Sequence, residues 1–208
     1  ASGFYSTAQT DPDVKQPRIL ILLDGSSSML EPWSAGQIRF KAAAQIITTL
    51  IDSVYRVNKD VEFALRVYGH QYPSQQNNCY DTKLEVMFSK DNLAQMGLRL
   101  EALHPLGVTP IAFSLKQAAE HDLLDPDRNN YSIILITDGG ESCGGNLCDV
   151  VKELLSKKIS FKPYILSLVD YAPLKQQYDC LGDYLLVTKQ QDVTNAVNKI
   201  VEGYCPDR

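Results

Sequence analysis

Two runs of consecutive aliphatic residues constrain the fold of this chain most strongly. The runs are Ile19–Leu23 and Ile133–Ile136, and no polar residue interrupts either of them. A run of this kind, without alternation between apolar and polar positions, predicts a strand that is buried on both faces. Such strands occupy the centre of a largely parallel sheet that helices cover on either side.

The segments around these runs alternate between strand and helix patterns. Strands are expected at Ile19–Leu23, Glu62–Tyr68, Lys83–Phe88, Tyr131–Ile136, Ser160–Val169 and Tyr184–Thr188. Helices are expected at Ile38–Val57, Asn92–Leu103, Pro110–Leu124, Leu147–Lys157, Pro173–Tyr178 and Gln191–Gly203. This alternation predicts an α/β fold with a doubly wound, mostly parallel six-stranded sheet flanked by helices. Residues 1–16 are polar and aperiodic, which predicts a tail or linker before a single domain at 17–208.

Composition argues against two classes of partner. The chain has 208 residues, a net charge of −5 and no cluster of Lys and Arg, so no nucleic-acid partner is expected. No apolar stretch approaches the roughly 18 residues that a membrane helix needs, so this segment is not expected to insert into a membrane. The first residue is Ala1 and not Met, which indicates a processed or excised piece.

The cysteines favour an oxidising compartment, which means an extracellular, cell-surface or periplasmic location. There are five: Cys79, Cys143, Cys148, Cys180 and Cys205. Cys180 and Cys205 flank the last strand and helix and could pair. Cys79 could pair with Cys143 or Cys148 across two loops, or Cys143 could pair with Cys148 locally.

Two alternatives remain for these cysteines. They could all be reduced and buried in a cytosolic domain. A metal site could instead use His70 with Cys79, Cys143 and Cys148, although no C-x-x-C pair supports it.

A cluster of hard oxygen atoms follows the first aliphatic run. Asp24, Ser26 and Ser28 form the pattern D-x-S-x-S. Carboxylate and hydroxyl oxygens are the ligands that Mg²⁺, Mn²⁺ and Ca²⁺ prefer. The alternative is an Asx turn or a helix N-cap, for which Asp and Ser are ordinary residues.

The second aliphatic run ends in the same way, at Asp138-Gly139. If the two strands are adjacent and the chain leaves them in opposite directions, their carboxyl ends form the switch point where such sheets bind ligands. Thr109 lies at the start of an expected helix, where it could be the N-cap before Pro110, and it would add a hydroxyl at the same edge. The expected metal ligands are therefore Asp24, Ser26, Ser28, Thr109 and Asp138.

These residues resemble the metal-ion-dependent adhesion site of von Willebrand factor type A (VWA) domains. The resemblance rests on D-x-S-x-S, on the threonine of Gly107–Pro110 and on the aspartate of Ile136–Gly139. The segments Val67–His70 and Thr137–Gly145 are most similar to a bacterial branch of the family, of secreted or envelope type. The resemblance implies that the hydroxyls touch Mg²⁺, Mn²⁺ or Ca²⁺ directly, while the aspartates often act through water.

The resemblance also implies a function without catalysis. The ion would keep an open position that an Asp or Glu of a protein partner fills, as in adhesion. Selectivity would come from loop residues around the ion, which are Trp33, His70, Tyr72, Tyr80 and Glu141. One alternative is a structural component of a cell-envelope, secretion or larger multidomain assembly. A metal-dependent hydrolase is disfavoured because the chain has no G-x-S-x-G elbow and no phosphate-binding loop.

Overall fold

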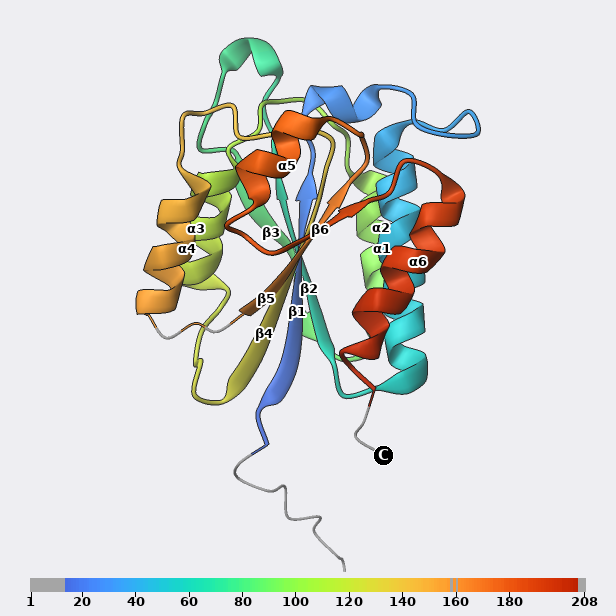
Figure 1. The fold of residues 1–208 in the computed structure, drawn as a ribbon, viewed down its shortest axis with the longest axis vertical. Helices are drawn as coiled ribbons and strands as arrows, with labels where there is room; N and C mark the ends of the chain where they lie inside the picture. Colours follow the sequence, from blue (N-terminus) through green and yellow to red (C-terminus); the bar gives the residue numbers. More distant parts are fainter. Residues whose placement is uncertain (1–13, 158, 160, 206–208) are drawn as a thin grey trace, which may run out of the picture.

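The computed structural model describes residues 14–157, 159 and 161–205, and its centre is one six-stranded sheet. The order across the sheet is β3-β2-β1-β4-β5-β6 (Figure 1). The strands are β1 (Gln16–Asp24), β2 (Glu62–Tyr68), β3 (Thr82–Ser89), β4 (Asn129–Thr137), β5 (Phe161–Ser167) and β6 (Asp183–Leu186). Only the pairing of the edge strand β3 with β2 is antiparallel within this sheet. The predicted fold class is confirmed.

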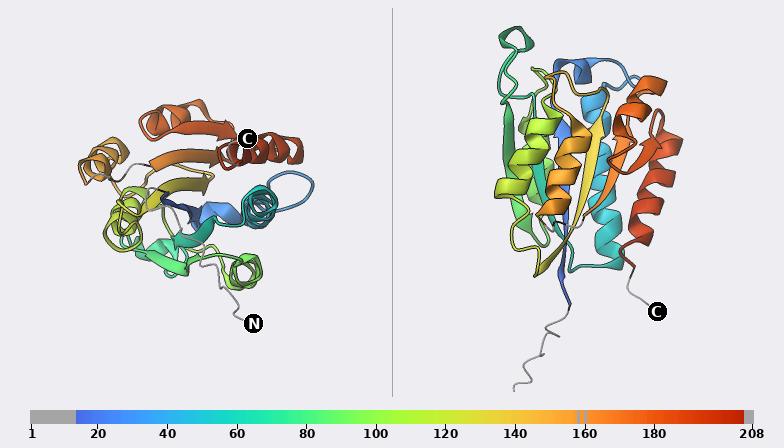
Figure 2. Two further views of the ribbon diagram at one scale, coloured as in Figure 1. Left: turned by 90° about the horizontal axis from the view of Figure 1, so that it is seen from below. Right: turned by 60° about the vertical axis from the view of Figure 1, so that its left-hand side comes forward.

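Six α-helices of the described chain cover the two faces of the sheet (Figure 2). One face carries α1 (Arg39–Val57), α2 (Leu93–Ala102) and α6 (Gln190–Glu202). The other face carries α3 (Ile111–His121), α4 (Leu147–Ser156) and α5 (Ala172–Tyr178). Two short 3₁₀ helices lie in loops, at Ser27–Leu30 and Ser74–Gln76. Of the helices described, none is both long and apolar enough to cross a membrane.

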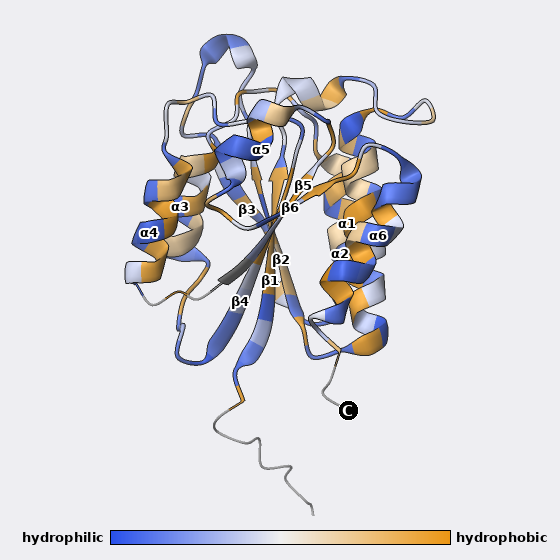
Figure 3. Ribbon diagram, in the orientation of Figure 1, coloured by the Kyte–Doolittle hydropathy of each residue, from blue (hydrophilic) through white to orange (hydrophobic). Residues whose placement is uncertain are grey.

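The first aliphatic run explains why β1 is central. Ile19, Ile21 and Leu23 pack into the core beneath α1, while Leu20 and Leu22 pack into the core beneath α3. All five side chains are fully buried. Figure 3 shows the hydrophobic centre of the sheet between helices whose outer faces are polar. The alternation of side chains along a strand therefore fills two cores from one run.

The predicted switch point is present. β1 and β4 are neighbours, and the chain continues from β1 to β2 on one side and from β4 to β5 on the other. The carboxyl ends of β1 and β4 lie at the same edge of the sheet, at the top of Figure 1. The described chain enters β1 and leaves α6 at the opposite edge.

Two local predictions need correction. Helix α3 begins at Ile111 and its N-cap position is Pro110, whose ψ of 63° is not helical. The prediction that Thr109 caps this helix is therefore wrong, because the helix starts one residue later than Pro110 would favour. Strand β1 begins at Gln16, one residue before the expected domain, and residues 1–13 of the expected tail lie outside the described residues.

Two disulfides lie near the carboxyl edge of the sheet. They are Cys79–Cys143 and Cys148–Cys180, and Cys205 is free and exposed. One of the expected pairings, Cys79–Cys143, is confirmed.

The other pairings are wrong. A Cys180–Cys205 bond does not form because Cys180 follows α5 on one face of the sheet, whereas Cys205 follows α6 on the opposite face. The local pairing of Cys143 with Cys148 is absent, since each bonds to another loop. Four cysteines are oxidised, so the reduced state and the metal site with His70 are also wrong. Among the described residues, no group of three or more His, Cys, Asp or Glu side chains could hold a metal ion.

Candidate metal centre

Asp24 is the buried anchor of the candidate site. It is the last residue of β1, and its side chain is fully shielded from solvent. Its Oδ1 accepts a 2.8 Å hydrogen bond from the amide of Ser26, and its Oδ2 accepts a 2.7 Å bond from Oγ1 of Thr137. Because Thr137 is the last residue of β4, the carboxylate of Asp24 links the ends of β1 and β4.

A chain of hydroxyl groups leads from the β1 loop to Asp138. Oγ of Ser28 donates a 2.7 Å hydrogen bond to Oδ1 of Asp138. Oγ of Ser26 lies 3.0 Å from Oγ of Ser28, and it must be the donor because Ser28 has already used its single proton. The three residues therefore form one directed network that ends on the carboxylate.

Thr109 approaches this network through its loop. The amide of Ser27 donates a 3.0 Å bond to the carbonyl of Gly107, which places the Thr109 loop against the β1 loop. Oγ1 of Thr109 lies 2.7 Å from the carbonyl oxygen of Gly140 and 2.7 Å from Oγ of Ser142. Within the described residues, no hydrogen bond links the Thr109 side chain to the other four expected ligands.

The site brings two carboxylates together in a buried place. Burial, and then the charge of Asp138, raise the pKa of Asp24 to about 6. Nη1 of Arg39, in the first turn of α1, donates a 2.8 Å bond to Oδ2 of Asp138. The positive charge of Arg39 thus partly compensates the negative charges of Asp24 and Asp138.

Two neutral tyrosine side chains lie near the carboxylate of Asp24. Tyr178 donates a 2.7 Å bond from Oη to the carbonyl of Gly139. Oη of Tyr68 is buried and has no hydrogen-bond partner among the described residues. Burial, with the charge of Asp24 as the next cause, raises the pKa of both tyrosines, so they remain protonated. They therefore offer Asp24 no compensating positive charge.

The donor set fits a hard divalent cation. Carboxylate and hydroxyl oxygens are the ligands that Mg²⁺, Mn²⁺ and Ca²⁺ prefer. The cluster carries one negative charge in excess when both aspartates are ionised, and a buried charge is costly unless an opposite charge compensates it. Asp24, Ser26, Ser28 and Asp138 would hold the ion, with Thr109 from the adjoining loop.

The expected partner-binding residues fall into two groups. Tyr72 and Tyr80 are exposed, with 42% and 75% of their surface accessible. The ring of Tyr80 packs edge-on against Phe113 at a centroid distance of 5.1 Å, which fixes its direction. These two aromatics are available to a partner.

The other three side chains point into the protein. Nε1 of Trp33 donates a 3.0 Å bond to the carbonyl of Val187. His70 is buried, with Nε2 2.8 Å from Oε1 of Glu85. The carboxylate of Glu141 accepts hydrogen bonds from the amide of Cys143 in its own loop and from the amide of Ala112 in the first turn of α3. Contact with a partner stays a prediction for all five residues, and the structure supports it best for the two tyrosines.

Two residues of the site were absent from the sequence prediction. Arg39 opens a helix, where a basic residue is usually solvated, and nothing local in the sequence points it at Asp138. Ser142 lies in a glycine-rich loop together with two cysteines. The position of that loop directly after Asp138 was the available signal for Ser142.

The sequence profile of the von Willebrand factor type A domain matches residues 19–176 of the chain. The chain belongs to this family. The match spans β1 to α5 and includes all five expected ligands of the VWA metal site.

Two curated relatives come from Bacillus subtilis (strain 168). The uncharacterized proteins YwmC and YwmD are each 27% identical to this VWA chain. Each alignment covers 76% of this chain, with 70% of YwmC and 68% of YwmD.

Solved structures share the fold at lower identity. The pilus adhesin SpaC from Lactobacillus rhamnosus GG superposes with a TM-score of 0.71 at 14% identity, over 92% of this chain and 31% of SpaC. Proximal thread matrix protein 1 from the mussel byssus, in a structure with a zinc-occupied MIDAS motif, has a TM-score of 0.65 at 16% identity. That match covers 92% of this chain and 46% of the mussel protein. The chain thus spans less than half of either solved protein, and identities this low show the fold alone.

Proposed function

We propose that this VWA domain is a non-enzymatic module that binds a protein partner through Mg²⁺, or through Mn²⁺ or Ca²⁺, held at the candidate metal centre. The convergence of Asp24, Ser26, Ser28 and Asp138 in one hydrogen-bonded network carries the proposal. Thr109 completes the donor set from the adjoining loop. When bound, the ion supplies a Lewis-acidic position that a carboxylate of the partner can occupy.

The charges of the chain's own residues favour an acidic partner. Three of the five donors are neutral hydroxyls, and Arg39 already occupies one oxygen of Asp138. The protein therefore neutralises a bound divalent cation incompletely, and an Asp or Glu side chain of the partner would supply the missing charge. The exposed side chains of Tyr72 and Tyr80 would contact the partner beside this acidic side chain.

The names of two similar solved structures agree with this proposal. The mussel protein carries zinc in its MIDAS motif, and SpaC is a pilus adhesin. The two disulfides support a location outside the cytoplasm, in an extracellular, cell-surface or periplasmic setting. The same site could serve adhesion or fixed assembly within an envelope structure, and both uses require the metal.

Calorimetric titration of Mg²⁺, Mn²⁺ and Ca²⁺ into EDTA-treated protein tests the proposal. The informative variants are Ser28→Ala, which removes a hydroxyl from the network, and Ser27→Ala as the matched control. Ser27 is exposed and contributes only its backbone amide. We expect one site in the wild type and in Ser27→Ala, and at least about tenfold weaker binding in Ser28→Ala. Equal affinities in all three proteins, or no binding by the wild type, would refute the proposal.

A further inference from the structure

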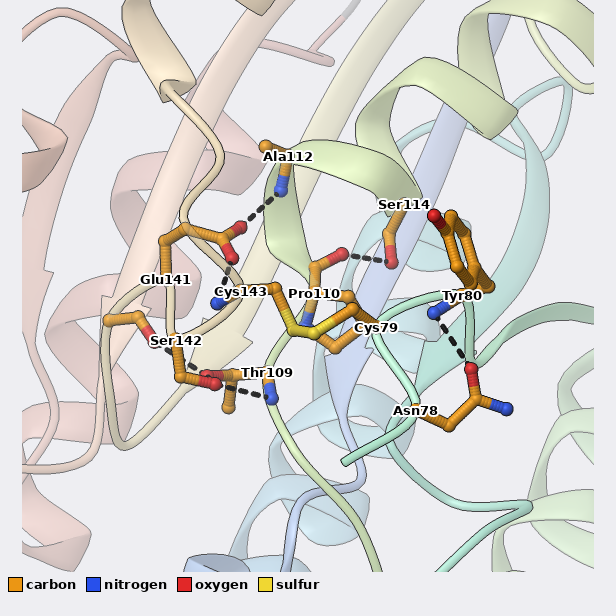
Figure 4. The surroundings of a disulfide bond; sticks show 11 residues. Asn78, Cys79, Tyr80, Thr109, Pro110, Ala112, Ser114, Glu141, Ser142 and Cys143 are labelled. Atoms are coloured by element: carbon orange, nitrogen blue, oxygen red, sulfur yellow. Dashed lines mark hydrogen bonds between the residues drawn. A yellow bond between two sulfur atoms is a disulfide. The ribbon is translucent and has the colours of Figure 1, made fainter. Parts of the chain in front are cut away.

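Among the described residues, Ser142 is the side chain that forms hydrogen bonds with Thr109. Its Oγ accepts a 3.0 Å hydrogen bond from the amide of Thr109 and lies 2.7 Å from Oγ1 of the same residue. Figure 4 shows the two side chains facing each other, next to the Cys79–Cys143 disulfide. Ser142 therefore holds both the backbone and the side chain of Thr109.

The hydroxyl of Thr109 has two hydrogen-bond acceptors within reach. Oγ1 of Thr109 also lies 2.7 Å from the carbonyl oxygen of Gly140, and a carbonyl can only accept. Oγ1 of Thr109 is also the donor in its contact with Oγ of Ser142, so its single hydroxyl proton has these two acceptors. The two acceptors fix the direction of the Thr109 hydroxyl, and its oxygen keeps its lone pairs.

The loop that carries Ser142 is rich in glycine, so its backbone is held only by specific contacts. Gly139, Gly140, Gly144 and Gly145 surround it, and glycine gives the backbone the largest conformational freedom. Ser142 itself is exposed, so burial does not fix it.

Three hydrogen bonds and one disulfide restrain this loop. Oε1 of Glu141 accepts a 2.6 Å bond from the amide of Cys143, and Oε2 accepts a 2.7 Å bond from the amide of Ala112 (Figure 4). The amide of Ser142 donates a 3.2 Å bond to the carbonyl of Thr109. The disulfide Cys79–Cys143 adds a covalent link to the β2–β3 loop at the residue after Ser142.

We propose that Ser142 is a positioning residue for Thr109, and that the Cys79–Cys143 disulfide keeps Ser142 in place, so that the oxidised loop pair aligns the Thr109 hydroxyl with the metal centre. The inference rests on the proposed function. It adds two elements from outside the five-residue motif, one of them covalent. Residues that orient metal ligands typically change metal affinity by 10- to 100-fold when they are mutated.

Mn²⁺ is the probe for the test, because its affinity and its number of bound waters can both be measured, by calorimetry and by water-proton relaxation. We expect Ser142→Ala to weaken Mn²⁺ binding about tenfold. We also expect more water on the bound ion, since a released Thr109 oxygen would be replaced by water. Ser142→Thr keeps a hydroxyl at the same position and should restore both values.

The second disulfide provides a matched control. Cys79→Ser/Cys143→Ser should reproduce the Ser142→Ala phenotype, whereas Cys148→Ser/Cys180→Ser should leave Mn²⁺ affinity and hydration near wild type. Thermal denaturation in EDTA measures the general loss of stability in each variant.

The outcomes separate this inference from the proposed function. If the wild type binds Mn²⁺ and Ser142→Ala binds it with the same affinity and hydration, the inference is wrong and the proposed function stands. Equal effects of the two disulfide pairs would show a role in stability only and would also overturn it. If the wild type binds no metal, the proposed function itself fails.

Discussion

Arg39 and Asp138 form an ion pair inside the candidate metal centre. Nη1 of Arg39 lies 2.8 Å from Oδ2 of Asp138, whose side chain is fully buried while that of Arg39 is 23% accessible. The opposite oxygen of the carboxylate accepts from Ser28. The carboxylate of Asp138 therefore interacts both with the guanidinium of Arg39 and with the hydroxyl network that would hold a metal ion.

Replacing Arg39 should strengthen metal binding. In Arg39→Gln the positive charge that repels a divalent cation is lost, and we expect Mg²⁺ affinity to rise roughly fivefold, or about 1 kcal/mol. Calorimetry on the EDTA-treated protein measures the change. Arg56→Gln is the control, because Arg56 lies on the same helix but is exposed and pairs with Asp52. Weaker binding in Arg39→Gln would mean that orienting Asp138 matters more than the repulsion.

The metal-free protein should lose stability as the pH rises through the titration of Asp24. The pKa of this carboxyl is 3.8 in the unfolded reference and about 6 in the fold, so the folded state binds the proton more tightly. Protonation therefore favours folding, and that contribution disappears between about pH 4 and pH 6, by roughly 2–3 kcal/mol. Urea denaturation in EDTA, compared with Asp24→Asn, isolates the effect. A difference between the two proteins that does not vary with pH would contradict it.

Gly69 should tolerate no side chain. Its φ is +68°, and a Cβ would lie 2.2 Å from the carbonyl oxygen of Val108, in the loop that leads to Thr109. We expect Gly69→Ala to lower the free energy of unfolding by about 3 kcal/mol or more and to weaken metal binding. Gly36→Ala separates the two causes, because Gly36 has a φ of +78° and nothing within 4 Å. That control should cost only about 1 kcal/mol, and equal losses would argue against the steric cause.

Arg66 and Asp122 form a second ion pair, buried between β2 and the end of α3. Both side chains are almost inaccessible, and the guanidinium binds both carboxylate oxygens. Arg66→Met would leave the carboxylate of Asp122 buried and unpaired, so we expect a loss of about 3–5 kcal/mol in unfolding free energy. Arg56→Met, which breaks an exposed pair with Asp52, should cost well under 1 kcal/mol. Chemical denaturation of both variants gives the comparison.

The sequence predicts the two central strands and the expected ligands that follow them, because the patterns that mark these residues are local. Two aliphatic runs predict two central strands, and central strands of a parallel sheet carry their carboxyl ends to one edge. Asp24, Ser26 and Ser28 follow one of these strands, and Asp138 follows the other. Their proximity needed only the adjacency of β1 and β4, which the sheet order confirms.

Features that depend on side-chain direction could not be predicted in the same way. The sequence locates Trp33 and His70 in loops, but only the packed structure turns them inward, toward Val187 and Glu85. Arg39 reaches a residue 99 positions away.

The cysteines show a similar limit. All four bonded cysteines lie in loops or at helix starts, and many pairings satisfy the spacing. The face of the sheet to which each loop returns decides among these pairings, and that is a property of the whole fold.

The strand that ends at Asp24 also determines how the module would respond to mechanical tension. β1 enters the sheet at the edge opposite the metal centre, so a pull between a partner at the centre and an attachment on the amino-terminal side acts along this strand. β1 is in register with β2 from Arg18 to Asp24 and with β4 from Gln16 to Leu23. Such a pull loads the hydrogen bonds on both sides in shear, all at once, instead of opening them one by one. The strand that presents the candidate metal centre is thus anchored on both sides against extraction.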